Sequence, residues 1–297
     1  MLGIRDTFHY LECKSCGCLQ LLDAPQDFER FYPSNYTAYR QYGPRNPILR
    51  RLWLYLRKRR NHGFLQQGWS FDHLLTEHYE YLQLRAFARL QIDQKARILD
   101  VGCGGGMLVK DLREQGYSNV LGIDRYIPQT INDANGVVVM KGTLSDLNST
   151  VWDLIMFHHS FEHMPDQADV LRSAAALLPS GGRCLIRIPV LGWAWTHYGV
   201  NWSQLDAPRH LFLHTEKSFR LLCEESGLLL QDVIYDSNEF QFWASELYSR
   251  DTDLASINSA QPQTVFSKSE MRKFKNEAKR LNSERRGDSR IFLLRKP

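Results

Sequence analysis

Short apolar runs and longer amphipathic stretches alternate along most of the chain. From residue 96 onward, seven apolar runs predict buried strands at residues 97–101, 119–124, 136–142, 152–158, 183–189, 228–235 and 290–296. Between them, residues 107–116, 165–179 and 216–227 carry apolar side chains at helical spacing. Strands that alternate with helices build a sheet that is covered on both faces. The pattern therefore predicts an α/β fold with a Rossmann-like, seven-stranded, mostly parallel sheet and helices on both faces. Its last two strands could form an antiparallel hairpin.

Further segments precede and interrupt this predicted sheet. Residues 1–40 are a small, aromatic, turn-rich N-terminal extension, and residues 41–92 are predicted to form a helical linker or lid with amphipathic helices at 48–60 and 73–91. Residues 93–297 form the predicted main domain. Within it, residues 250–287 are rich in Ser, Asn, Lys and Arg and are predicted to be an exposed polar insertion, helical from Ser269 to Arg285.

Composition and charge narrow the class of protein. The 297 residues are 43% hydrophobic and 24% charged, enough for a buried core, and a net charge of +4 is too small to indicate a nucleic-acid partner. No apolar run reaches transmembrane length, and the first residues, MLGIRDTFHYLEC, are too charged for a signal peptide. Six cysteines in a chain of this length form no disulfide framework, so we expect a cytoplasmic protein. The arginine-rich helix 48–60 suggests contact with a membrane surface or an anionic glycan, or simply a solvated face.

A glycine-rich turn follows the first predicted strand, in the sequence RILDVGCGGG. Glycines allow a sharp turn and a close approach of the backbone to a ligand, and the helix that follows offers N–H groups. Asp124 ends the second predicted strand, where a carboxylate can accept both hydroxyls of an adenosine ribose. A dinucleotide fingerprint would have glycine at the position of Met107. The loop therefore fits a ligand without a pyrophosphate better than it fits NAD or FAD.

From residue 96 to about 240 the chain resembles the class I S-adenosylmethionine-dependent methyltransferases. The matching stretches are ILDVGCGGG, VLGID, KGTLSDL, WDLIMFHHSFEHMPD, LLPSGGRCLIRIP and WSQLDAPRHLFLHT, in the order of the family. The resemblance is greatest to the bacterial branch of polysaccharide and secondary-metabolite pathways, which is related to the ubiquinone-pathway O-methyltransferases. It implies S-adenosyl-L-methionine as the cofactor and methyl transfer as the activity.

The resemblance also implies which residues bind the cofactor. They are Asp100, Gly102, Cys103, Gly104, Asp124, Thr143, Leu144 and His158. The first four belong to the turn around the methionine part, and Asp124 would hold the ribose. Thr143 and Leu144 would border the adenine, where the wider family prefers an aspartate at the first position. His158 would lie beside the methionyl end.

The turn after the fourth predicted strand, HHSFEHMPD, contains His159, Glu162 and His163. It also matches the inverted zinc-protease motif HxxEH, but that motif requires a long helix and Pro165 follows at once. The ubiquinone-pathway relatives carry ExxEH here. Because His159 replaces the first glutamate, we expect no metal ion. Glu162 and His163 are interpreted as residues that hold the turn by hydrogen bonds, with a catalytic role as the alternative.

The loop after the fifth strand, WSQLDAPRHLFLHT, carries Asp206, Arg209 and His210. Loops at the carboxyl ends of parallel strands face the ligand crevice in this fold. A methyl acceptor must be aligned and lose a proton, and a histidine suits that task. His210 is the first candidate for the base and His159 the second, with Asp206 as a further catalytic candidate. The alternative is that Asp206 and Arg209 form a structural ion pair around Pro208.

Cysteines cluster in the N-terminal extension, in the sequence HYLECKSCGC. Cys13, Cys16 and Cys18 resemble half of the zinc ribbon that precedes many related methyltransferase domains. A structural zinc site usually needs four ligands, and a second CxxC pair is missing from this sequence. We therefore interpret the segment as a zinc-ribbon-like remnant that does not bind zinc.

The acceptor is expected to be a small molecule or glycan, methylated on an oxygen of a sugar or another polar metabolite. Aromatic side chains near the second loop motivate the sugar because flat rings suit a pyranose face, with a place in the core as the equal alternative: Trp193, Trp195, Tyr198 and Trp202. Two alternatives stay open at this point: a nucleic-acid or protein methyltransferase, and a catalytically inactive methyltransferase-like subunit. The sequence does not indicate the oligomeric state.

Overall fold

The computed structural model describes residues 6–31, 51, 55, 86–87, 89–132, 138–147, 151–254 and 262–297. Most of the predicted helices 48–60 and 73–91, and most of the predicted lid 41–92, lie outside the described residues. Of the helices that are described, none is long and apolar enough to cross a membrane.

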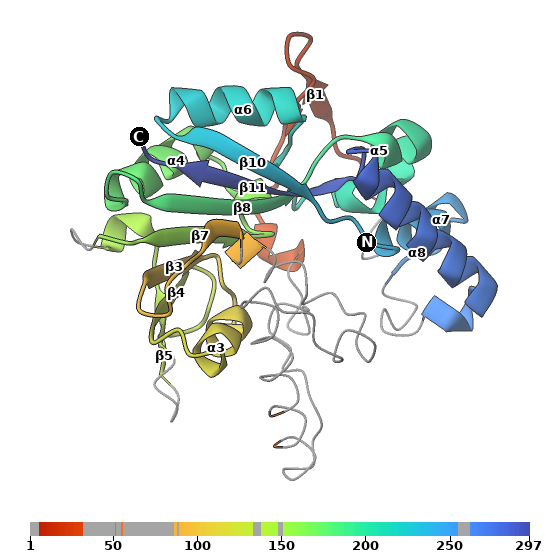
Figure 1. Ribbon diagram of the computed structural model, residues 1–297. Coiled ribbons are helices and arrows are strands. Elements are labelled where there is room, and N and C mark those ends of the chain that lie inside the picture. Colours follow the sequence, from red (N-terminus) through yellow and green to blue (C-terminus); the bar gives the residue numbers. More distant parts are fainter. Residues whose placement is uncertain are drawn as a thin grey trace.

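A mixed eight-stranded sheet forms the centre of the protein, with the strand order β10-β11-β8-β7-β3-β4-β6-β5 (Figure 1). Its strands are β3 (Arg97–Val101), β4 (Asn119–Asp124), β5 (Ile131–Asn132), β6 (Val138–Lys141), β7 (Leu154–His158), β8 (Arg183–Pro189), β10 (Leu229–Tyr235) and β11 (Ser289–Arg295). Strands β6, β4, β3, β7 and β8 are parallel to their neighbours in this group, and β11 pairs antiparallel with both β8 and β10. All seven predicted strands are present, and the last two form the expected antiparallel pair.

The predicted count of seven strands is wrong by one. The additional strand, β5, is only two residues long and pairs antiparallel with β6, Ile131 opposite Val139 and Asn132 opposite Val138. Two residues are too few to produce a periodic pattern, so the sequence carried no signal for this strand.

Helices cover both faces of the sheet, as predicted. On one face lie α4 (Gln167–Leu177) and α6 (Glu216–Glu225), which bury Leu171 and Phe219 in a core shared with β7 and β8. On the other face α3 (Met107–Glu114) buries Val109 and Leu112 in a second core. Figure 1 shows α4 and α6 on the opposite side of the sheet from α3. The carboxyl ends of the parallel strands are left open to loops.

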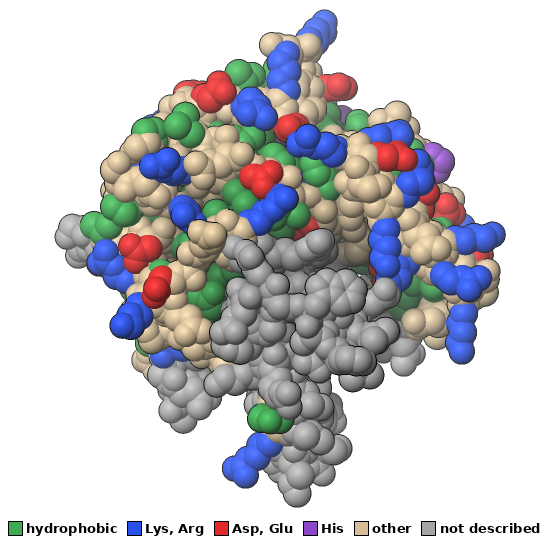
Figure 2. All heavy atoms as spheres, in the orientation of Figure 1, with side chains coloured by type: hydrophobic (Ala, Val, Ile, Leu, Met, Phe, Trp, Pro, Cys, Tyr) green, Lys and Arg blue, Asp and Glu red, His purple; other side chains and the backbone are tan. Residues whose placement is uncertain are grey.

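The predicted polar insertion contains a helix but is not simply exposed. Helix α8 (Lys268–Ser283) lies within it, close to the predicted range, and α8 packs near α7 (Phe240–Ser249) and α5 (Trp193–Tyr198). Leu254, Phe266 and Leu281 are buried against α7. A few apolar residues in a polar run are therefore enough to attach the insertion, while the charged face of α8 stays at the surface (Figure 2).

Short 3-10 turns connect several of these elements. They are η1 (Phe28–Phe31), η4 (Leu144–Asp146), η5 (Phe161–His163), η6 (Gly199–Asn201), η7 (Ser203–Leu205) and η8 (Pro262–Thr264). Two of them matter for the candidate site, because η5 follows β7 directly and η7 leads into the loop that carries His210.

The N-terminal extension forms a hairpin that joins the loop of His210. Strands β1 (Tyr10–Glu12) and β2 (Leu19–Leu21) pair antiparallel. On its other edge β2 pairs antiparallel with β9 (Phe212–Leu213), which completes a three-stranded sheet. The Tyr10 hydroxyl donates a 2.8 Å hydrogen bond to the His210 carbonyl, and the Leu21 amide donates to the Leu211 carbonyl at 2.9 Å. The first segment of the chain thus braces a loop about 200 residues further along.

Candidate functional site

The glycine-rich turn between β3 and α3 requires glycine at specific positions. Gly102, Gly104 and Gly106 have φ angles of +73°, +54° and +73°, in the left-handed region that favours glycine. A Cβ at Gly102 would overlap the Ser160 side chain, and a Cβ at Gly106 would overlap Val139. The backbone here is held close to its neighbours, and only glycine leaves the turn in this shape.

Two carboxylates lie beside this turn. Asp124, at the end of β4, accepts hydrogen bonds from the Gly104 amide at 2.9 Å and the Tyr126 amide at 2.8 Å. Asp100 is buried, and its Oδ1 has no hydrogen-bond partner among the described residues. Burial, with the nearby charge of Asp124 as a second cause, raises the pKa of Asp100 to about 7. A buried acceptor without a donor, next to a turn that has no room for a Cβ at Gly102 or Gly106, fits a ligand that supplies hydrogen-bond donors.

The remaining predicted cofactor residues lie around the same corner of the sheet. Thr143 is the N-cap of η4, and its amide donates to Asp146 Oδ2 at 2.7 Å in a capping box. Hydrogen bonds from Thr143 lower the pKa of Asp146. Leu144 is buried in the core. Its side chain therefore packs mainly against protein.

Cys103 and His158 are also enclosed. The Cys103 sulfur lies against Gly122 of β4, where a Cβ would clash with it, and burial raises the pKa of the thiol. His158 ends β7, and burial lowers its pKa well below the ordinary value. Cys103 therefore packs between the turn and β4, and His158 lies at the end of β7.

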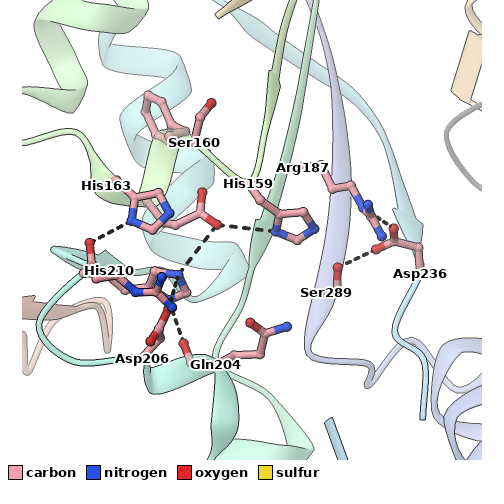
Figure 3. Close-up of polar contacts among 12 residues, drawn as sticks. His159, Ser160, His163, Arg187, Gln204, Asp206, His210, Asp236 and Ser289 are labelled. Carbon is pink, nitrogen blue, oxygen red and sulfur yellow. Dashed lines mark hydrogen bonds and ion pairs between the residues drawn. The ribbon is translucent and has the colours of Figure 1, made fainter. Parts of the chain in front are cut away.

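A second polar cluster lies where η5 meets the loop of residues 206–211, and we call it the histidine–glutamate cluster: His159, Glu162, His163 and His210. Figure 3 shows His159, His163 and His210 grouped in this cluster. Glu162 Oε1 lies 3.4 Å from His159 Nδ1 and 3.9 Å from His210 Nε2. Both histidines are candidate bases from the sequence. In the structure they lie on either side of the Glu162 carboxylate, which the sequence pattern assigns mainly to holding the turn.

Hydrogen bonds between the two loops fix this cluster. His163 Nδ1 donates to the Arg209 carbonyl at 2.8 Å, and His210 Nδ1 donates to the Gln204 carbonyl at 2.7 Å. Asp206, with a φ of +39°, forms the predicted ion pair with Arg209, and its Oδ2 also lies 3.8 Å from His210 Nε2. The interpretation of Glu162 and His163 as residues that hold the turn is therefore correct for His163.

Burial keeps these imidazoles neutral. It lowers the pKa of His163 and of His210 to about 4, and of His159 to about 3, where the charge of Arg187 is a second cause. The His159 side chain is 31% exposed and that of His210 only 6%. The exposed part of the His159 side chain does not include Nε2, which is itself buried.

Three members of the cluster could also hold a metal ion. Ligand atoms of Glu162, His163 and His210 all lie within 4.8 Å of one another. Sequence reasoning missed this combination because His210 lies far from the other two along the chain. The expectation that no metal binds remains a prediction.

Trp202 does not have the role proposed from the sequence. Its side chain is fully buried, and its Nε1 donates to Asp288 Oδ2 at 2.7 Å, so its ring is unavailable to a sugar. Trp193 stacks on His197 with ring centroids 4.5 Å apart, and Trp193 and Tyr198 are half-buried. Trp195 is half-buried too. Aromatic spacing alone could not distinguish core from surface rings.

Comparison with known proteins places this site in a family. The methyltransferase domain family matches residues 71–233. A ubiquinone biosynthesis O-methyltransferase of Vibrio parahaemolyticus is 30% identical over 96 residues, which cover 29% of this chain and 40% of that protein. The enzyme of the same name from Xylella fastidiosa is 35% identical over 102 residues, covering 31% and 41%. The chain thus matches about two fifths of the length of these relatives.

A solved structure extends the similarity to the fold. The crystal structure of the cyclase SpnF superposes with a TM-score of 0.50 at 15% identity, covering 84% of this chain and 95% of that one. At this identity the likeness concerns the fold alone.

The chain belongs to the methyltransferase domain family. Its domain is of the S-adenosylmethionine-dependent kind, and S-adenosylmethionine is the methyl donor that such a domain uses. The residues present fit this cofactor: the turn has no room for a side chain at Gly102 or Gly106, and Asp100 and Asp124 offer acceptors for its ammonium and hydroxyl groups.

Proposed function

We propose that this protein transfers a methyl group from S-adenosylmethionine to a hydroxyl oxygen of a small polar metabolite or glycan. The observation that carries the proposal is the position of the histidine–glutamate cluster next to the glycine turn. Ser160, adjacent to His159, donates a 2.6 Å hydrogen bond to the Val101 carbonyl, and its side chain fills the space above Gly102. A base at His159 is therefore one residue away from the cofactor turn.

The cofactor would be held by the residues around β3 and β4. Asp124 is proposed to bind the ribose hydroxyls, and Asp100, Gly102, Cys103 and Gly104 to enclose the methionine part. Thr143, Leu144 and His158 would complete this pocket. When bound, the cofactor supplies a methyl group on a sulfonium, which needs no further activation. The protein must then align the acceptor and remove its proton.

His159 is the better placed of the two candidate bases. Protein groups face both nitrogens of His210: the Gln204 carbonyl at Nδ1, and Glu162 and Asp206 at Nε2. His159 meets Glu162 at Nδ1, while its Nε2 has no hydrogen-bond partner among the described residues. The acceptor oxygen would gain the methyl group as its proton passes to His159 Nε2, leaving a neutral thioether on the donor. His210 and Asp206 would complete the cluster behind Glu162.

Two observations favour oxygen as the methylated atom. The matched relatives are named O-methyltransferases, and a hydroxyl is the acceptor that most needs a base. The test measures labelled methyl transfer to hydroxyl, amine and thiol acceptors, including nucleotide sugars and simple phenols. For a hydroxyl substrate, His159→Ala should lower turnover roughly 10²- to 10⁴-fold. Near-normal turnover in that variant but not in His210→Ala would move the base to His210.

A further inference from the structure

Glu162 is a buried carboxylate that receives no hydrogen bond from any described residue. Its side chain is 1% exposed, and both oxygens are buried without a hydrogen-bond partner. An ionised carboxylate buried without donors is costly, and such a group in a folded protein calls for an explanation. The residues around Glu162 suggest an explanation for its unpaired carboxylate.

The backbone at Glu162 is fixed from both loops. The Glu162 carbonyl accepts a 2.9 Å hydrogen bond from the Leu211 amide, and the neighbouring His163 ring is bound to the Arg209 carbonyl. The Tyr10 hydroxyl holds the next carbonyl of that loop, at His210. The position of the carboxylate is therefore determined by contacts that do not involve the carboxylate itself.

Of the two imidazoles that flank Glu162, only His159 can donate to it while neutral. His210 Nδ1 donates to the Gln204 carbonyl, so a neutral His210 carries no proton on the Nε2 that faces Glu162. His159 turns Nδ1 towards Glu162 at 3.4 Å. That distance is long for a hydrogen bond, as is common for catalytic contacts before the substrate binds.

The surroundings of His159 on the other side are charge-balanced. Figure 3 shows the His159 ring beside the pair formed by Arg187 and Asp236. Arg187 Nε donates to Asp236 Oδ2, and Ser289 donates to the other oxygen of Asp236. Since this guanidinium already has its own carboxylate, Glu162 is the carboxylate in direct contact with His159.

We propose that Glu162 is a positioning residue, which fixes His159 as the tautomer protonated on Nδ1 and balances its charge once Nε2 has taken the acceptor proton. This inference rests on the proposed function. The unprotonated Nε2 then lies on the side of the ring away from Glu162, as a buried atom with no hydrogen-bond partner among the described residues. The same geometry of carboxylate, imidazole and hydroxyl activates the nucleophile in serine hydrolases.

The tautomer can be read directly by nuclear magnetic resonance. Protein labelled with ¹⁵N-histidine, with the His159 signals assigned from His159→Asn, is compared at neutral pH with Glu162→Gln and Glu162→Met. Gln keeps an oxygen that can accept from Nδ1 but loses the charge, whereas Met keeps the volume and loses both. We expect protonated Nδ1 in wild type and Glu162→Gln, and loss of that state in Glu162→Met. Asp169→Asn, at an exposed carboxylate on α4, should leave the His159 signals unchanged.

Two results would overturn the proposal. One is a wild-type His159 that carries its proton on Nε2. The other is one equivalent of Zn²⁺ or Mg²⁺ bound to wild type and lost in both Glu162→Gln and His210→Ala, because Glu162 would then be a metal ligand. Binding of S-adenosylhomocysteine, followed by its effect on the melting temperature, checks that each variant is folded. Absence of that binding in wild type would instead count against the proposed function.

Discussion

The main-chain amide of Gly104 lies 2.9 Å from Oδ2 of Asp124, so the glycine turn is joined directly to the end of β4. Each carboxylate oxygen accepts one backbone hydrogen bond and retains capacity for a second. Asp124 can therefore bind ribose hydroxyls without giving up its contacts with the protein. The turn and the proposed ribose site are therefore joined by a direct hydrogen bond.

Replacing Asp124 tests the proposed ribose site. Asp124→Ala should weaken binding of S-adenosylmethionine by about 1.5–3 kcal/mol for each charge-assisted hydrogen bond that is lost. Isothermal titration calorimetry measures the change, with Asp169→Ala on the exposed part of α4 as the control. Wild-type affinity in Asp124→Ala would remove this residue from the site.

Gly102 and Gly227 have nearly equal φ angles, so they allow the cost of a left-handed backbone to be separated from the cost of steric overlap. Gly102 has a φ of +73° and Gly227 a φ of +76°, but a Cβ meets Ser160 at Gly102 and nothing within 4 Å at Gly227. Gly227→Ala should cost only the left-handed backbone, about 1–2 kcal/mol of unfolding free energy. Gly102→Ala should cost more and abolish the shift in melting temperature caused by S-adenosylhomocysteine. If both variants lose the same unfolding free energy in chemical denaturation, the Ser160 side chain moves aside at little cost.

His214 should make the protein sensitive to acid. Its ring bonds to Gln167 at 2.7 Å and Ser218 at 3.0 Å, and burial lowers its pKa from 6.5 to about 4. The unfolded chain then binds a proton that the folded chain does not, so the stability is complete above pH 6.5 and falls as the pH approaches 4. His214→Asn should reduce the slope of unfolding free energy in this window by about 1.4 kcal/mol per pH unit.

A second variant distinguishes this titration from a mere loss of stability. Ser218→Ala removes a hydrogen bond to the His214 ring but keeps the imidazole, so it should lower the stability and leave most of the slope. Urea unfolding between pH 4 and 7 gives both quantities. An unchanged slope in His214→Asn would assign the acid sensitivity to other buried histidines.

The cysteines of the N-terminal hairpin are expected to hold no stoichiometric zinc. A structural site needs four ligands, and the sequence supplies one CxxC pair and Cys18, whose sulfur lies 3.8 Å from His214 Nδ1. Elemental analysis of purified protein measures the metal content. One zinc per chain that is lost in Cys13→Ser would contradict this expectation, whereas zinc lost only in Glu162→Gln would lie in the histidine–glutamate cluster.

Local patterns predicted the sheet and the cofactor turn well, because both depend on neighbouring residues. A buried strand is a continuous apolar run, and the turn is a fixed string of glycines that ends at Asp100 on one side and Met107 on the other. The resemblance to a family then supplied roles for single positions such as Asp124. Those roles remain proposals, but the structure places all of these residues at the same corner.

Features that depend on distant partners could not be predicted in this way. Nothing near Glu162 in the sequence indicates that His210 approaches it from the next loop, or that His159 turns Nδ1 towards it. The sequence could not distinguish Trp202 from the aromatic residues near it. In the structure, its hydrogen bond to Asp288 shows that it belongs to the core. The polar composition of residues 250–287 concealed the few side chains, such as Phe266, that bind the insertion to α7.

The hairpin of β1 and β2 has a practical consequence for handling this protein. Tyr10 and Leu21 hold the backbone at residues 210 and 211, and Lys217 and Thr215 in turn hold the carbonyls of Ser15 and Cys16. An affinity tag fused close to Tyr10, a protease cut in the hairpin or alkylation of its thiols would therefore disturb the loop of His210, although the modified residues lie far from it in the chain. A tag after Pro297 would instead follow β11, whose end contacts residues 178–182.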